Sequence, residues 1–450
     1  MSQVFEILRR KLFWTVDLLK GKRVAAHYSD IKSIMENFYA DDSKKRRDDY
    51  LANIIHHAIE TTPFYSKYKT NNSVAQLPVI NKNIIRDNFE SFRSTAYSDN
   101  QVFAVVTSGS TGTPFKIYHD QNKKNRNSAD TIYFAKLAGY HIGQRLIYFK
   151  IWNEINKKKW FTAWAQNIVA QDVTNLSATS INALISKIKK DHSLKGFLGY
   201  ASAYEAICKH LDAVQAQQLH CNVGSAIAMS EGLNDYTKNA MQKYFAVKTV
   251  SRYSNVENGI LAQQSIHYGN EFYLNMASYY IEVLNFDNDL PVKDGMPGRV
   301  VVTDLFNYAM PVIRYDTGDV AMMCSSSGNK YKTPVLLNVE GRRMDMVFNT
   351  KGELVSSFTI TNNMWKYTEI QQYQFIQLSA TAYLFKINSV NDFKRETELI
   401  EEFKAYFGHD AVIKVEYVTD VPLLASGKRK KVMNLMQPDS NFQRNQNDAV

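Results

Sequence analysis

VFAVVTSGSTGTP, residues 102–114, joins a short apolar strand to a loop of glycines and hydroxyl residues. Glycines expose backbone N–H groups and small hydroxyls donate hydrogen bonds to phosphate oxygens, so this pattern is typical of phosphate binding. It is not a Walker A loop, because the chain has no G-x-x-x-x-G-K-[ST], and it is not a nucleophile elbow, because G-x-S-x-G is also missing. Taken alone, the loop suits an ordinary surface turn equally well.

Hydrophobic periodicity on both sides of this loop predicts layered α/β structure. The first forty residues and Ser43–Ile59 have a helical pattern. Downstream, the strand candidates are Ile147–Trp152, Phe197–Ala203 and Lys248–Ser254, and the helix candidates are Ile181–Lys190 and Glu205–Leu219. The chain becomes strand-rich from Glu271 to Cys324, and after Gly341–Leu354 the pattern is that of a compact α+β region. The predicted fold class is therefore α/β (α+β).

The composition excludes several classes of protein. With 450 residues, 45% hydrophobic and 22% charged, the chain can bury a large core, so disordered, collagen-like and disulfide-scaffold proteins are excluded. It has no run of about 18 apolar residues and no signal-peptide pattern at its start. The three cysteines lie far apart and offer neither a zinc site nor a disulfide framework. We expect a cytoplasmic protein.

The net charge of +10 suggests anionic partners. Nucleic acid is not favoured, because the basic runs are short and no zinc finger, RNP-like strand or heptad zipper occurs. In the first helix an apolar series at a 3.6-residue period is interrupted by Arg9, Arg10 and Lys11; the series is Val4, Phe5, Leu8, Leu12, Val16 and Leu19. Such a helix suits peripheral contact with an anionic membrane face. We favour the alternative, that it packs on the main domain.

Several other segments, taken with the loop, resemble motifs of the adenylate-forming (acyl-CoA synthetase and adenylation) superfamily. The branch that the chain resembles is the phenylacetate–CoA ligase family with its CapK-like relatives of capsular polysaccharide biosynthesis. The motifs occur in the family's order and are Ile227–Leu233 (IAMSEGL), Tyr253–Gly259 (YSNVENG), Thr303–Leu305 (TDL), Met310–Asp319 (MPVIRYDTGD), Gly341–Met346 (GRRMDM) and Ser426–Lys428 (SGK).

The resemblance implies a domain division. Residues 1–344 would form a large nucleotide- and acid-binding domain, with a helical lead-in over 1–60. Residues 345–435 would form a small mobile C-terminal domain with a catalytic lysine, Asp345 would be the hinge, and 436–450 would be a disordered tail.

The resemblance also implies roles for single residues. The ATP-binding set would be Thr107, Ser108, Gly109, Ser110, Thr111, Gly112, Tyr253, Ser254, Asn255, Asp319 and Arg342. Tyr253 would stack on adenine, and Asp319 would accept hydrogen bonds from the ribose hydroxyls. Glu257 would bind Mg²⁺, a hard cation that prefers carboxylate oxygen. The alternatives are a packing tyrosine and a surface ion pair.

Catalytic roles would fall to Lys428, Glu257 and Arg342. Lys428 would bridge the acid's carboxylate and the α-phosphate, a role that suits a mobile ammonium. Arg342 would lie near the ribose and phosphate, although a structural role is the alternative.

Some positions depart from the family pattern. Phe115 stands where many superfamily members have lysine after the loop, and Lys116 is displaced by one. Met344 replaces the first acidic residue of the hinge motif, and Ser254 and Val256 depart from Y-G-x-[ST]-E. These departures leave open a weakened or repurposed enzyme.

The function that the resemblance implies is an ATP- and Mg²⁺-dependent carboxylate ligase. An acyl-AMP would form, and an amine, a sugar or the thiol of coenzyme A would accept the acyl group, in capsule or O-antigen biosynthesis. The alternatives are an acyl-CoA ligase of the phenylacetate type, and a non-catalytic nucleotide-binding scaffold at a polysaccharide assembly site.

Overall fold

The computed structural model describes residues 2–69, 73–107, 115–152, 159–267, 269–325, 332–342, 346–355, 359–360, 363–389, 393–422 and 430–436. By its contacts the chain divides into two compact units. The larger unit contains residues 1–108, 113–317 and 321–339, and the smaller contains Glu340–Val450 together with Gly318–Val320. Each unit has its own hydrophobic core.

The larger unit begins with helices. They are α1 (Ser2–Leu19), α2 (Arg23–Glu36), α3 (Asp41–Thr61) and α4 (Lys82–Asp87), with short 3₁₀ turns η1 (Ser66–Tyr68), η2 (Val74–Gln76), η3 (Phe89–Phe92) and η4 (Asp99–Gln101). The helix predicted at Ser43–Ile59 is α3. Asn81 fixes the start of α4, because its side chain accepts hydrogen bonds from the backbone N–H groups of Asn83 and Ile84.

The segment that precedes the predicted phosphate loop is one strand of a separate hairpin. β1 (Phe103–Thr107) and β2 (Phe115–His119) are antiparallel, and Thr107 is the cross-strand partner of Phe115. Residues 108–114, which join the two strands, lie outside the described residues.

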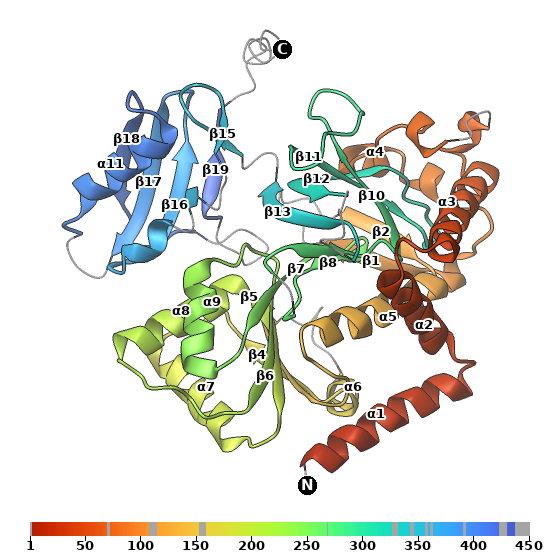
Figure 1. The fold of residues 1–450 in the computed structure, drawn as a ribbon, viewed down its shortest axis with the longest axis horizontal. Helices are drawn as coiled ribbons and strands as arrows, with labels where there is room; N and C mark the ends of the chain where they lie inside the picture. Colours follow the sequence, from red (N-terminus) through yellow and green to blue (C-terminus); the bar gives the residue numbers. More distant parts are fainter. Residues whose placement is uncertain are drawn as a thin grey trace. The chain divides into compact units, whose positions relative to one another are not determined.

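An 11-stranded sheet forms the centre of the larger unit, in the order β10-β11-β12-β13-β9-β8-β7-β6-β5-β3-β4 (Figure 1). Its strands are β3 (Arg145–Lys150), β4 (Ile168–Asp172), β5 (Lys195–Tyr200), β6 (Val223–Met229), β7 (Thr249–Asn255), β8 (Gly259–Gln263), β9 (Phe272–Leu274), β10 (Tyr279–Leu284), β11 (Pro297–Asp304), β12 (Tyr315–Cys324) and β13 (Val335–Arg342). Neighbours from β4 to β7 are parallel, and β7, β8, β9 and β13 pair antiparallel.

Helices connect the parallel strands and cover them. The connecting helices are α6 (Trp160–Ala165), α7 (Ala178–Lys190), α8 (Ala201–Ala213) and α9 (Asp235–Phe245), whereas α5 (Gln121–Leu137) joins β2 to β3 and contacts β8. In Figure 1 α7, α8 and α9 lie against the parallel strands, and their apolar faces share a core with Phe149 and Phe197. Ser177 and Asn234 cap α7 and α9 with side-chain oxygens.

The strand predicted at Phe197–Ala203 ends earlier than expected. β5 stops at Tyr200 and Ala201 already begins α8. Alanine is the best helix former, and the Glu231 carboxylate accepts a hydrogen bond from the Ser202 N–H at 2.8 Å, which satisfies one N-terminal donor of the new helix.

α1 packs on the larger unit, but with its polar side inward and its apolar face outward. Its two carboxylates, Glu6 and Asp17, are buried, whereas Phe5, Leu8 and Leu12 are exposed. Asp17 accepts hydrogen bonds from the N–H groups of Val24 and Ala25, so it caps α2 and orients α1 with its polar side inward.

In its described residues, the smaller unit contains a four-stranded sheet and the helix α11 (Glu396–Phe407). The strands are β16 (Ile370–Gln377), β17 (Ala382–Ser389), β18 (Val412–Tyr417) and β19 (Val432–Asn434), in the order β18-β17-β16-β19. α11 packs on the sheet through Phe403 and Phe407, which meet Phe375 of β16. The hairpin of β14 (Val347–Phe348) and β15 (Leu354–Val355) and the 3₁₀ turn η6 (Met364–Lys366) precede β16 in the chain.

Candidate functional site

A tight turn after β7 presents Glu257. Asn255, the last residue of β7, accepts a hydrogen bond from the Asn258 N–H at 2.7 Å, and its own amide donates to Asn258 Oδ1 at 3.0 Å. β8 then starts at Gly259, which has a φ of +120° and leaves no room for a Cβ beside Asn127 and Tyr279. The Y-S-N-V-E-N-G motif is therefore a rigid connection.

Glu257 is only 5% exposed, and its side chain has two charged or polar partners. The Tyr315 hydroxyl donates to Oε1 at 2.8 Å, and Lys82 Nζ of α4 lies 2.9 Å from the same oxygen. A buried carboxylate is stable as an anion only with such partners. Glu257 is thus not the ordinary surface ion pair that was the alternative.

His119, the last residue of β2, supports the same turn. Its Nε2 donates to the main-chain oxygen of Glu257 at 2.7 Å. Burial lowers the pKa of His119 below 6.5, and Lys123 nearby lowers it further. A neutral imidazole therefore joins the hairpin to the turn.

Phe115, which stands where many superfamily members have lysine, lies in an aromatic environment. Its buried ring is parallel to that of Tyr315, with centroids 6.4 Å apart, and Lys82 Nζ lies 5.4 Å from its centroid. Lys116 is on the other face of β2 and donates to Tyr118 Oη at 2.8 Å. Among the described residues, Lys82 of α4 therefore faces the Phe115 ring, whereas Lys116 lies on the opposite face of β2.

Tyr253 of β7 is half-buried and lies against β12. Its hydroxyl is 3.3 Å from Thr317 Oγ1, which itself donates to the main-chain oxygen of Val300 at 3.0 Å. Because the Thr317 proton is already used, Tyr253 is the donor of the pair. Ser254 follows on β7, and Asp319 is on β12.

The R-Y-D-T-G-D motif divides into structural and candidate binding residues. Arg314 is 2% exposed with a φ of +51°, and its guanidinium contacts both oxygens of Glu282. It also donates to the main-chain oxygens of Ala75, Leu77 and Asp289. Arg314 therefore has a structural role, because it joins the start of β12 to β10 and to the segment around Ala75.

The T-D-L motif is also structural. Asp304 accepts from the Phe306 N–H at 3.0 Å and pairs with Lys123 Nζ at 2.6 Å, and both side chains are buried. This ion pair joins α5 to the end of β11.

The remaining predicted residues have no described side chain. Thr107 and Arg342 end β1 and β13, and only their backbone is described. Ser108, Gly109, Ser110, Thr111, Gly112, Asp345 and Lys428 lie outside the described residues.

Sequence reasoning missed Lys82, His119 and the role of Tyr315. Tyr315 was inside a quoted motif, but Lys82 stands in NKNIIRD, which has no signature of a site. Only the fold brings α4 next to the turn after β7.

Glu257 fits magnesium in one particular way. Among the described residues no group of three or more His, Cys, Asp or Glu is placed to hold a metal ion. Mg²⁺ commonly binds one or two carboxylates together with substrate phosphates, so a single buried carboxylate suits an ion that arrives with ATP.

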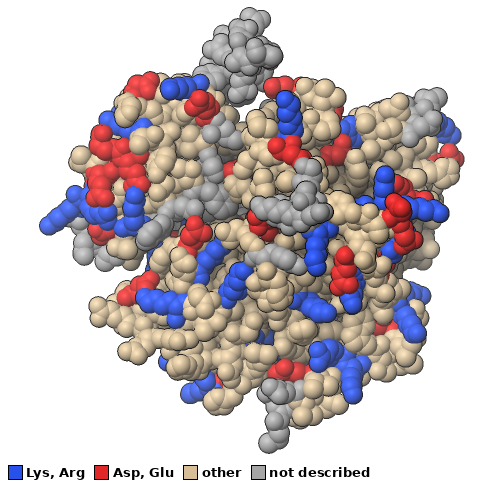
Figure 2. Space-filling view, viewed as in Figure 1, with Lys and Arg blue, Asp and Glu red and all other residues tan. Residues whose placement is uncertain are grey.

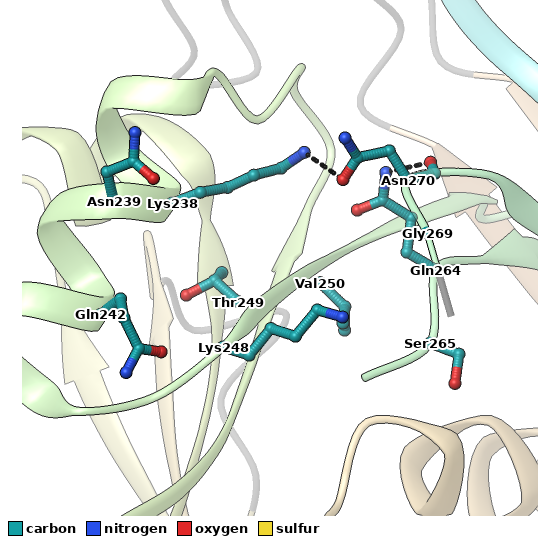
Figure 3. Close-up of a pocket in the computed structure, with 10 residues that line it drawn as sticks. All are labelled: Lys238, Asn239, Gln242, Lys248, Thr249, Val250, Gln264, Ser265, Gly269 and Asn270. Atoms are coloured by element: carbon teal, nitrogen blue, oxygen red, sulfur yellow. Dashed lines mark hydrogen bonds between the residues drawn. The ribbon is translucent and has the colours of Figure 1, made fainter. Parts of the chain in front are cut away.

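A cavity of about 210 Å³ lies at the end of β7 opposite to Glu257 (Figure 3). It is lined by residues of α9, by Lys248 and the start of β7, and by Gln264, Ser265, Gly269 and Asn270. Lys238 Nζ donates to Asn270 Oδ1 at 3.2 Å, and Lys248 Nζ donates to the main-chain oxygen of Ile266 at 2.9 Å. Both ammonium groups are thus engaged by the protein itself. In Figure 2 the visible face shows Lys and Arg spread among Asp and Glu, without a single basic patch.

Solved structures with the same architecture are acid-activating ligases. 2-Hydroxyisobutyryl-CoA ligase, in complex with R3-HIB-AMP, superposes with a TM-score of 0.70 at 15% sequence identity, over 92% of this chain and 93% of that chain. The chain has the fold of the adenylate-forming ligases. The predicted fold class is therefore confirmed.

Two other adenylate-forming structures extend the likeness. Anthranilate CoA ligase AuaEII, with anthranoyl-AMP, gives a TM-score of 0.55 at 16% identity, over 75% of this chain and 66% of that chain. Amide bond synthetase McbA from Marinactinospora thermotolerans gives 0.53 at 14% identity, over 74% and 68%.

The smaller unit has a match of its own. Residues 347–435 match the family described as the CapK C-terminal domain, which supports the resemblance to the CapK-like branch. No curated protein has a sequence that matches this chain. Among the described residues no helix is long and apolar enough to cross a membrane.

Proposed function

We propose that this chain is an ATP- and Mg²⁺-dependent ligase that activates a carboxylic acid as its acyl-adenylate and transfers the acyl group to an amine or thiol. The acid's carboxylate oxygen attacks the α-phosphorus, and pyrophosphate leaves. The acceptor's nitrogen or sulfur then attacks the carbonyl carbon and AMP leaves. No covalent nucleophile on the protein is required.

The observation that supports this most is the environment of Glu257. In the fold of the adenylate-forming ligases, a buried carboxylate at the end of β7 has the Tyr315 hydroxyl and the Lys82 ammonium within 3 Å of one oxygen. A purely structural turn does not require a buried anion, whose desolvation is costly.

Glu257 would hold the magnesium ion that accompanies ATP, and that ion would supply positive charge to the phosphates. Lys82 would supply a second positive charge in place of the lysine that many superfamily members have at the position of Phe115. Tyr253 would orient the adenine, and Asp319 would accept hydrogen bonds from the ribose hydroxyls.

Three other parts of the proposal concern residues of which the structure describes no side chain. The loop Thr107–Gly112 would bind the phosphates through N–H groups and hydroxyls. Lys428 would stabilise the charge that builds between the carboxylate and the α-phosphate, and Arg342 would lie near the ribose. Asp345 would be the hinge between residues 1–344 and 345–435, and 436–450 would be a disordered tail.

The acceptor and the pathway are proposed from the comparisons. The CapK C-terminal domain match supports the CapK-like branch, and from the resemblance to that branch we propose a role in polysaccharide biosynthesis, with an amine on a sugar as the acceptor. The names of the CoA ligases among the similar structures support coenzyme A as the alternative acceptor. We propose that the protein works in the cytoplasm.

One observation favours a non-catalytic nucleotide-binding scaffold as the second candidate. The Lys82 ammonium already neutralises Glu257, so the carboxylate has a partner without any metal ion. In an active ligase this ion pair must open or share the carboxylate when Mg·ATP binds.

An ATP–pyrophosphate exchange screen separates the two candidates. The panel contains aromatic acids, short fatty acids, amino acids and uronic acids, and hydroxylamine traps the acyl-adenylate as a hydroxamate. Lys428→Ala should lower the hydroxamate rate about 100-fold or more, as expected when a preorganised charge is removed. Lys430→Ala, in the same basic run, should have little effect.

A wild-type protein that binds ATP but exchanges no pyrophosphate with any acid would support the scaffold. Equal rates for Lys428→Ala and the wild type would remove Lys428 from the mechanism.

A further inference from the structure

The apolar face of α1 points away from the molecule and has no cover among the described residues. It consists of Phe5, Leu8, Leu12, Val16 and Leu19, an outer stripe at three- and four-residue spacing. Leu12 is 61% exposed and Leu19 is 81% exposed. Large exposed apolar patches are rare on proteins that have no partner, so this surface indicates one.

The rest of the fold holds the helix in this orientation. Asp17 caps α2, and the rings of Trp14 and Tyr28 of α2 are 5.8 Å apart. Near the other end, the backbone of Glu6 approaches Gly143 so closely that a Cβ there would collide with the Glu6 oxygen, and Gly143 has a φ of +95°. Contacts near both ends of α1 therefore fix its orientation, and this orientation keeps the apolar stripe exposed.

A second element adds aromatic side chains to the same region. α6 has Trp160, Phe161 and Trp164 in one short helix, and Trp160 is 79% exposed. Asn167, just after α6, donates to the main-chain oxygen of Gly143 at 3.1 Å, so Gly143 borders both helices. Tryptophan is enriched where proteins meet the headgroup layer of a bilayer.

The acidic side chains of α1 face the protein, whereas two of its basic side chains lie beside the exposed stripe. Its only acids, Glu6 and Asp17, are buried, whereas Arg9 and Lys11 lie on the flanks of the outer stripe. A cavity of about 460 Å³ beneath the helix is lined by two more cations, Arg10 and Lys136. Long cationic side chains beside an apolar stripe can reach lipid phosphates while their stems stay in apolar surroundings.

From this geometry we propose that α1 and α6 form a docking surface for an anionic lipid bilayer, with α1 lying in the plane of the interface. A helix of 18 residues is about 27 Å long and would present the whole stripe at one depth. The inference does not depend on the proposed function. It goes beyond the peripheral contact of a single basic helix, because two elements build the surface.

Vesicle co-sedimentation of the full chain tests the proposal. The vesicles are phosphatidylcholine alone, or phosphatidylcholine mixed with phosphatidylglycerol, at low and at high salt. We expect binding to the anionic vesicles to be about tenfold or more tighter than to the neutral ones, and to weaken with salt. Equal binding to both, or binding to neither, would overturn the proposal.

Matched variants locate the surface. The double variant Leu8→Glu/Leu12→Glu should lose binding about tenfold or more, because it puts charge into the stripe. The control Leu290→Glu/Met296→Glu changes residues of similar exposure elsewhere in the larger unit and should bind like the wild type. All four positions are exposed, so thermal melting should show both proteins folded.

Two further measurements address α6 and the competing occupant. Tryptophan fluorescence of the wild type should shift to shorter wavelength on anionic vesicles, and Trp160→Phe/Trp164→Phe should lose most of that shift. An unchanged shift would remove α6 from the surface. If sedimentation without lipid shows a dimer that only Leu8→Glu/Leu12→Glu dissolves, the surface belongs to a second copy of the chain and the lipid proposal is wrong.

Discussion

Lys82 Nζ lies 2.9 Å from Glu257 Oε1, and the two residues are 175 positions apart in the chain. If Lys82 supplies the charge that is missing at Phe115, Lys82→Met should weaken Mg·ATP binding by about 1.5–3 kcal/mol, the range for hydrogen bonds to charged groups. Titration calorimetry measures this. Lys116→Met, which removes the cation of the opposite face, should leave the affinity unchanged.

The Glu257 side of the pair gives the complementary result. Glu257→Gln should bind ATP without Mg²⁺ about as well as the wild type, yet gain little when Mg²⁺ is added. An Mg²⁺ effect as large as in the wild type would show that another residue binds the ion.

Asp319→Ala should weaken ATP by about 1.5–3 kcal/mol, because two neutral hydroxyls lose an ionised acceptor. The comparison is Asp287→Ala, an exposed aspartate in the turn after β10. Unchanged calorimetric affinity in folded Asp319→Ala would remove the ribose assignment.

Asp345→Pro tests the hinge that the sequence predicts. Proline fixes φ near −65° and removes an N–H, so it should hinder a backbone rotation without removing any group from the adenylation chemistry. We expect single-turnover pyrophosphate release to persist while transfer to the acceptor is lost. Asp345→Ala, which leaves the backbone free, should retain both steps. Equal losses in both steps would make residue 345 an ordinary linker position.

The free energy of unfolding should decrease as the pH is lowered, in part because of His27. Burial lowers its pKa below 6.5 and Arg126 lowers it further, so the unfolded chain binds the proton more readily. The contribution is therefore complete well above pH 6.5 and is lost as the pH falls below it. Urea unfolding at about pH 7.5 and about pH 5.5 should show a smaller loss for His27→Gln than for the wild type. The exposed His192→Gln should behave like the wild type; the same loss in all three proteins would exclude His27.

The pattern of the sequence predicted several helices and strands, but not where some of them end or which residues they contact. The predictions at Lys248–Ser254 and Ile181–Lys190 correspond to β7 and α7, and the order of the motifs indicated the adenylate-forming fold. The end of β5 was missed because a tertiary contact, Glu231 to the Ser202 N–H, decides where α8 begins. Lys82 was invisible because its importance comes from a neighbour distant in sequence.

The face of α1 could not be predicted for a different reason. Periodicity shows that a helix has an apolar side, but not whether that side meets protein or lipid. Here two buried carboxylates, Glu6 and Asp17, lie on the inner side of the helix, and Asp17 accepts hydrogen bonds from backbone N–H groups of α2.

The pairing of Thr107 with Phe115 has a consequence for how this family can vary. The two residues close residues 108–114 into a loop whatever path it follows, so the hairpin sets where the loop starts and stops. Loop-closure entropy rises so slowly with length that one added glycine should cost only about 0.1 kcal/mol of stability. Folding therefore imposes almost no selection on the length of this loop. If the length of this loop is strictly limited, the limit comes from the ligand. A series of glycine insertions would then reduce the affinity for the ligand while the free energy of unfolding stays nearly constant.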